Sequence, residues 1–318
     1  MKGRELRARL LRRLASLLVT ALLVSTITFL ALRVLPGDPA RLIVGTDGDP
    51  AAVERIRALL GYDRPVLVQL WDWLGGLVRG DLGTSLRYDL PVLQLIAGRL
   101  DVTLALTAGA TLLAVLTAGP LGIFAAPRRG RLGDAAAVVF SQAGLAVPSF
   151  WVGMLLILVF SVRLRWVPAA GYVPFTQDPV TWARSLVLPV LALALPQAAV
   201  LTRLVRSSVL EVLEQDYVRF ARAKGLSERV VLYRHALRNA LIPPLTVLGL
   251  QVGQLLAGSI VVETVFALPG LGQLLLNAIA ARDLPVVQGA VAFAALAVVL
   301  VNFVVDAVYA MVDPRVRQ

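Results

Sequence analysis

The 318-residue sequence contains no cysteine and a single histidine. Without cysteine the chain can form no disulfide and build no thiolate nucleophile or Cys-ligated metal site. The lone histidine, His235, leaves no cluster of His ligands for zinc or iron. The only lysines, Lys2 and Lys224, lie in no G-x-x-x-x-G-K-[ST] loop of the kind that binds nucleotide phosphates. The sequence therefore predicts a non-catalytic chain with no metal site and no bound nucleotide.

Charged residues are also scarce. They make up 16% of the chain, against about a quarter in soluble proteins, while 58% of residues are hydrophobic and the mean hydropathy is +0.78. Long stretches carry no charge, and the basic residues behind the net charge of +11 flank those stretches. A nucleic-acid-binding domain would instead gather them on one soluble face with aromatic neighbours. This pattern predicts a protein of the lipid bilayer that binds no nucleic acid.

A helix needs about 20 apolar residues to cross a bilayer. The run after the basic amino terminus exceeds a signal-peptide core, so we expect an uncleaved first span. A run at 264–281 contains Leu268-Pro-Gly-Leu-Gly272, which predicts a loop with a short helix over 273–281. We therefore predict an all-α integral membrane protein with six transmembrane helices, over 14–32, 102–127, 135–162, 185–202, 239–262 and 284–312.

The distribution of arginine and lysine predicts the orientation. They are abundant in 1–13, 127–134, 203–240 and 313–318, whereas 33–100 is close to neutral. The opposite orientation is favoured by Arg163, Arg165 and Arg184, which flank a loop predicted to lie outside. We follow the larger difference in arginine and lysine content between the two sets of segments. We expect a multi-pass protein of the cytoplasmic membrane with both termini in the cytoplasm.

The segment 33–100 is too long for a simple connection. Short helices are expected over 50–60 after Asp49, ending at Gly61, and over 66–77, with Leu70, Trp71, Trp73 and Leu74 as the apolar body of the second. Either a small cap on the membrane domain or a docking surface for an outside partner fits. The chain thus divides into 1–32 (basic terminus and first helix), 33–100 (extracytoplasmic insertion) and 101–318 (five-helix core).

The core contains a cytoplasmic segment, 207–240, that reads as a helix–glycine–helix elbow. Leu213, Tyr217, Phe220 and Lys224 are predicted to share one stripe of the first helix. Gly225 suits the left-handed position after that helix, and Ser227 suits the N-cap of the next. Val230, Tyr233 and Leu237 should share a face of the second helix. The elbow could rest on lipid headgroups or fit into another protein.

The sequence resembles the dipeptide/oligopeptide and nickel permease family of ATP-binding-cassette importers almost from end to end. The segments that carry the resemblance are Leu35–Pro39, Trp73–Gly83, Val147–Trp151, Asp216–Val230 with His235–Pro243, Glu263–Gly272 and Asp313–Arg317. In the wider superfamily the coupling loop begins Glu-Ala-Ala. Here Arg219, Phe220 and Ala221 hold those places, so only the last matches.

The resemblance implies a permease subunit that translocates di- or oligopeptides, working with a second homologous permease, two cytoplasmic ATPase subunits and an extracytoplasmic substrate-binding protein. ATP and Mg would bind the ATPases and not this chain. Nickel or another small solute is the alternative cargo. The elbow would couple to an ATPase through Tyr217, Arg219, Phe220, Ala221, Arg222, Ala223, Lys224, Gly225, Leu226 and Ser227.

Polar residues within or beside the spans are candidates for the pathway or its gate. Helix–helix hydrogen bonding is the competing explanation for the glutamines, and Pro148, Pro189 and Pro196 are expected to kink helices. A secondary transporter would usually show inverted repeats and several buried ionisable residues, and neither is present. The candidates are Gln142, Gln197, Gln251, Gln254, Glu263, Pro269 and Gly270.

Overall fold

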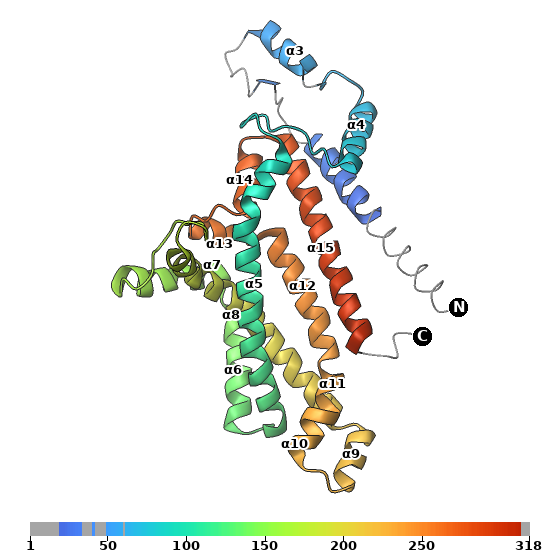
Figure 1. Cartoon of the computed structure of the whole chain (residues 1–318), viewed down its shortest axis with the longest axis vertical. Coiled ribbons are helices and arrows are strands. Elements are labelled where there is room, and N and C mark those ends of the chain that lie inside the picture. Colours follow the sequence, from blue (N-terminus) through green and yellow to red (C-terminus); the bar gives the residue numbers. More distant parts are fainter. Residues whose placement is uncertain (1–18, 34–39, 42–48, 60, 313–318) are drawn as a thin grey trace, which may run out of the picture. The chain divides into compact units, whose positions relative to one another are not determined.

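A computed structural model of the chain describes residues 19–33, 40–41, 49–59 and 61–312, and these are mostly helical (Figure 1). The basic clusters at both ends and the Leu35–Pro39 segment of the family resemblance lie outside the described residues. The chain divides into two compact units. One comprises residues up to Asp101 with Pro269–Leu300, and the other comprises Val102–Leu268 with the residues from Val301 onward.

The first unit contains the helix Val19–Arg33, α3 (Pro50–Leu59) and α4 (Val66–Arg79). It also holds α14 (Leu271–Ala280), the start of α5 (Val92–Ala125) and most of α15 (Leu284–Val312). Asp49 accepts a hydrogen bond from the Ala51 amide at 3.0 Å, as expected of an N-cap. Beyond α3, Gly61 has the predicted left-handed conformation, at φ +67°. The first short helix of the 33–100 segment was thus predictable from its end signals, and the second, predicted over 66–77, extends to Arg79.

The core of this unit joins side chains from distant parts of the sequence. Val92 and Ile96 of α5 are fully buried together with residues of α14 and the first turn of α15. Trp73 packs against this cluster, but Trp71 is 70% exposed. The prediction that both tryptophans form the apolar body of α4 is therefore wrong for Trp71. Because Trp71 and Trp73 are two positions apart on a helix, their side chains point in directions that differ by about 200°.

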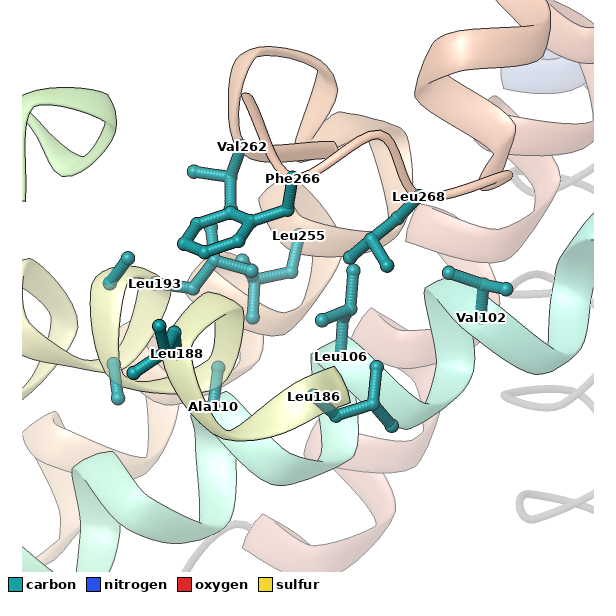
Figure 2. Packing of buried hydrophobic residues seen from close by; sticks show 12 residues of the cluster. Val102, Leu106, Ala110, Leu186, Leu188, Leu193, Leu255, Val262, Phe266 and Leu268 are labelled. Atoms are coloured by element: carbon teal, nitrogen blue, oxygen red, sulfur yellow. The ribbon is translucent and has the colours of Figure 1, made fainter. Parts of the chain in front are cut away.

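The second unit contains α6 (Leu132–Ala146), α7 (Ser149–Leu156) with a π-helical continuation Ile157–Arg163, and α8 (Pro179–Leu213). It also holds α12 (Ile242–Gly258) and α13 (Ile260–Val265). Figure 2 shows its main core, where Phe266 and Leu268 close over Leu188 and Leu193 of α8 and Leu106 of α5. Helix α8 contacts α6, α7 and α12 and is the central rod of the unit.

Small residues let these helices approach closely. A Cβ built on Gly144 of α6 would lie 2.6 Å from the Cβ of Ala199 in α8, closer than real side chains allow. Glycine at this position thus sets the α6–α8 separation, as small residues commonly do between membrane helices.

Three helices among the described residues are long and apolar enough to cross a membrane, and the number rises to five if each of two bent pairs is one span. α5 starts ten residues before the predicted span and α8 extends past both ends of its own. Charged residues such as Arg99 and Asp101 mark the limit of a charge-free run, but the helix continues beyond them. The six-span count stays a prediction, since the first helix is described only from Val19.

The span predicted over 135–162 is not straight. α6 and the segment Ser149–Arg163 meet at 97°, with Val147 and Pro148 at the break. Pro148 cannot donate the amide hydrogen bond that would continue α6. Pro189 and Pro196, in contrast, lie inside the continuous α8.

Candidate functional site

The elbow over 207–240 is built from the end of α8, three short α-helices and a π-helical turn (Figure 1). α9 (Asp216–Ala223) is followed by Lys224 and by Gly225 at φ +81°, the predicted left-handed turn. α10 (Glu228–Val230) continues through a π-helical turn, Val231–Ala236, into α11 (Leu237–Ala240). Ser227 occupies the predicted N-cap position with extended backbone, although its hydroxyl caps no amide within the described chain.

A buried base fixes the elbow to α8. Val218 and Ala221 of α9 and Val231 of the π-helical turn are almost fully enclosed. They pack with Val205 and Val209 of α8 in one apolar cluster. The elbow is therefore packed on α8 through a shared apolar cluster, so a movement of the elbow moves α8 with it.

Hydrogen bonds tie the two arms of the elbow together. Arg222 donates to both carboxylate oxygens of Glu228, at 2.9 and 3.3 Å, and to the carbonyl of Leu213 at the end of α8, at 3.2 Å. The Tyr217 hydroxyl accepts from the Asn239 amide at 2.9 Å. Sequence reasoning missed Glu228 and Asn239, because both partners lie across the turn and no periodic pattern connects them.

The stripe predicted for the first elbow helix is wrong for Leu213, which belongs to α8 and not to α9. Leu213 is buried, but Tyr217 is 39% exposed and Phe220 62% exposed, while the buried face consists of Val218 and Ala221. Helix α8 ends at Leu213 and α9 begins at Asp216, so the helical phase does not carry over the turn between them.

The face predicted for the second elbow helix is also wrong in part. Val230 and Tyr233 are exposed and only Leu237 is buried. Val231 and Ala236 take the inward positions, because the π-helical turn between them places residues five apart on one side.

The outward side of the elbow is a crest of exposed aromatic and aliphatic side chains among cations. The Lys224 ammonium lies 4.6 Å from the centre of the Phe220 ring. Leu226 and Tyr233 are exposed on the same elbow, Tyr233 by 64%. Arg219, Ala223, Gly225 and Ser227 of the predicted coupling set are exposed as well.

An ion pair braces the unit just before the elbow begins. Arg206 of α8 donates to both carboxylate oxygens of Asp134 in α6, and Asp134 also accepts from the Gly130 amide at 2.9 Å. Asp134 is 6% exposed. The sequence did not single out this pair, because the partners are 72 positions apart.

The structure brings two of the predicted pathway residues together and separates others. Gln251 of α12 donates weakly to the backbone carbonyl of Gln197 in α8, at 3.4 Å. Both side-chain carbonyl oxygens are buried without a described hydrogen-bond partner. Gln254 is exposed, and Gln142 lines a cavity of about 470 Å³ with Arg203 and Arg206.

The predicted gate residues fall in different units. Glu263 is fully buried in the second unit, where it accepts from the Ser259 hydroxyl at 2.9 Å and from the Thr103 hydroxyl at 3.4 Å. Pro269 and Gly270 belong to the first unit, and Gly270 precedes α14 with an extended backbone.

Comparison with known families decides the identity of the chain. Residues 118–318 match the inner membrane component of binding-protein-dependent transport systems, and residues 6–107 match the N-terminal part of such membrane components. The chain belongs to this family of transport-system membrane components. The permease is thus a membrane-spanning subunit of an ATP-binding-cassette importer, as the sequence motifs indicated.

Relatives of the permease cover nearly its whole length. It is 48% identical over 98% of its residues, and 99% of the relative, to a protein of Brucella abortus named as a peptide transport system permease. It is 44% identical over 96% of its residues, and 98% of the relative, to a glutathione transport system permease of Escherichia coli.

A solved structure supports the fold. A chain from inward-facing conformations of the MetNI methionine ABC transporter matches with a TM-score of 0.53, covering 70% of the permease and 97% of that chain at 17% identity.

Proposed function

We propose that this permease translocates di- or oligopeptides into the cell, using ATP hydrolysed by separate subunits. The observation that carries the proposal is the sequence identity of 48% and 44%, over nearly the full length, to permeases named for peptide and glutathione transport. Glutathione is itself a tripeptide, so both names describe peptide cargo.

The elbow is proposed as the place where ATPase movement enters the permease. Such a site needs a firm attachment to the membrane helices and an outward surface that a partner can grip. The cluster around Val218 and Val231 supplies the first, and the exposed Phe220 and Tyr233 supply the second. Exposed aromatic residues are enriched where proteins dock. An elbow resting only on lipid headgroups would not need the Arg222–Glu228 cross-link.

The working assembly is proposed to contain a second homologous permease, two cytoplasmic ATPases and an extracytoplasmic binding protein. Each chain carries one such elbow, so one permease would engage one ATPase. Closure of the ATPases on ATP would draw the elbow along, and α8 and α12 would move with it, because α8 ends and α12 begins at the elbow.

The proposed orientation places both termini and the elbow in the cytoplasm and the 33–100 insertion outside. The support is the concentration of arginine and lysine in 1–13, 127–134, 203–240 and 313–318. The 101–318 portion then forms the membrane core, with six spans in the whole chain.

The test is purification of the permease from its native membrane with whatever accompanies it, followed by reconstitution in vesicles. We expect a second permease and an ATPase in the complex, and ATP-dependent uptake of a labelled dipeptide once binding protein is added. Uptake of nickel or a sugar in place of peptide would refute the proposed cargo. Recovery of the chain without any ATPase would refute the proposed role of the elbow.

A further inference from the structure

The first unit contains a cavity of about 380 Å³ that no step of the proposed transport cycle uses. Its walls come from the end of the first helix, from α3 and α4 of the insertion, from the loop at Leu82 and Gly83, and from the first turns of α15. Volumes of this order are typical of small-ligand sites, at the lower end of the usual range.

Arg33 is the principal charge in the cavity wall. Its guanidinium carbon lies 5.2 Å from the centre of the Phe29 ring and 4.8 Å from the centre of the Tyr62 ring. Cation–π contacts of this kind accept no hydrogen bond, so the N–H groups of the guanidinium still need acceptors. The Arg33 Nε atom is buried, yet no described residue accepts a hydrogen bond from it.

Trp73 contributes a second donor of the same kind. Its indole Nε1 is buried and likewise lacks an acceptor among the residues described. An indole N–H can only donate. Leaving a buried donor unpaired is costly, and here two such donors belong to residues that line one cavity. An acceptor group seated there would satisfy both after small shifts of the lining side chains.

Tyr62 adds a third donor to the wall. Burial raises the pKa of the Tyr62 hydroxyl, and Asp283 raises it further, whereas Arg33 lowers it. The hydroxyl therefore stays protonated at neutral pH and can donate to a ligand.

The walls are held in place by contacts of their own. The buried Asp283 carboxylate accepts from the Ser85 hydroxyl at 2.5 Å and from the Leu86 amide at 3.1 Å, which fixes the loop beyond Gly83. Arg64 pairs with Asp72 at 3.2 Å in the same lining. That pair is neutral, so the lining carries one net positive charge, on Arg33.

We propose that this cavity binds the carboxylate of a small extracytoplasmic solute, held by Arg33 and Trp73; the inference rests on the proposed function in taking that solute to be a peptide. The flat carboxylate matches the edge of a guanidinium, and a single negative charge balances the lining. A free phosphate carries a larger charge at neutral pH.

A lipid headgroup fits less well. The large hydrophobic side chains that the first helix exposes include Leu23, Ile27 and Leu30, whereas Arg33 follows the buried Ser25 and Phe29 at four-residue steps. Residues four apart share a helix face. The guanidinium therefore lies on the inward side of this helix, away from the face that acyl chains would cover.

The absence of natural cysteine allows a direct test. In Ala58→Cys the permease carries one thiol at the cavity wall, and its maleimide labelling is followed in the permease–ATPase complex, without binding protein or ATP, in phosphatidylcholine nanodiscs. We expect alanyl-alanine to slow labelling and alanyl-alanine amide to have little effect. Val78→Cys, 77% exposed on α4 and outside the cavity, is the matched control and should not be protected.

Variants of the two donors complete the test. In the Ala58→Cys background, Arg33→Gln should weaken protection by about 10-fold or more and Trp73→Phe by about 3-fold or more. Arg79→Gln, an exposed arginine of the insertion outside the cavity, should not change it.

Three outcomes would overturn the inference: equal protection by the amide, protection by phosphatidylglycerol instead of the dipeptide, or unchanged protection in both Arg33→Gln and Trp73→Phe. The labelling assay needs no transport. A failed uptake experiment therefore refutes only the proposed function, and absent protection in a complex that takes up peptides refutes only this site.

Discussion

Substitution of Gly225 by valine should uncouple ATP hydrolysis from transport. Gly225 has φ +81°, and a residue with a side chain costs about 1–2 kcal/mol there, more if it is β-branched. No described heavy atom lies within 4 Å of a Cβ built at this position. The added side chain therefore meets no neighbour, and the whole cost lies in the backbone.

A cost of about 1–2 kcal/mol changes a conformational equilibrium about 5–30-fold. The strained turn can relax only by returning to negative φ, which redirects α10 relative to α9. That rotation separates Arg222 from Glu228, whose hydrogen bonds span the turn. The crest around Phe220 would then present a different surface to the ATPase.

The assay is solute transported per ATP hydrolysed in vesicles holding the complete importer. Gly225→Asn should be mildest, because asparagine tolerates the left-handed region, followed by Gly225→Ala and Gly225→Val. Ala136→Val, at an exposed position of α6 with ordinary helical geometry and outside the elbow, is the control and should transport normally. Normal coupling in Gly225→Val, with the protein inserted at its usual level, would refute the reasoning.

Three further substitutions test other parts of the second unit. Phe220→Ala should change the free energy of unfolding by no more than about 0.5 kcal/mol, because the ring is 62% exposed. It should also reduce the amount of ATPase that is purified with the permease, and an unchanged amount would contradict the docking role. Asp134→Asn should destabilise the permease by about 3–5 kcal/mol, seen as a lower Tm, because Arg206 loses its charged partner; an unchanged Tm would contradict this. Gln251→Leu should keep the free energy of unfolding within about 1 kcal/mol of the parent, since the hydrogen bond from Gln251 to Gln197 is long, and should slow uptake; normal uptake would remove Gln251 from the pathway.

Local signals in the sequence were sufficient for much of the fold. Asp49, Gly61 and Gly225 act on their own neighbours, and each ends or begins a helix as predicted. Charge-free runs located the apolar helices but not their ends, because a helix such as α5 includes Arg99 and Asp101 and begins at Val92. The 97° break at Pro148 shows that a proline can end a helix where only a kink is expected, depending on how the flanking segments pack.

The candidate site was predictable in place but not in detail. The elbow and its glycine followed from the sequence, whereas the buried face did not, because α9 restarts after a turn and Val231–Ala236 is π-helical. The Asp134–Arg206 and Arg222–Glu228 pairs depend on tertiary contact, which cannot be read from a single sequence.

Helix α8 has a mechanical consequence for how the permease opens. A helix of 35 residues is about 50 Å long, and this one is gripped by α6, α7 and α12 while its last turns anchor the elbow. A rod held on several sides does not swing alone. A displacement of the elbow is therefore transmitted through α8 to α6, α7 and α12. Opening then requires these packed helices to slide together, and not a hinge rotation of α8 alone.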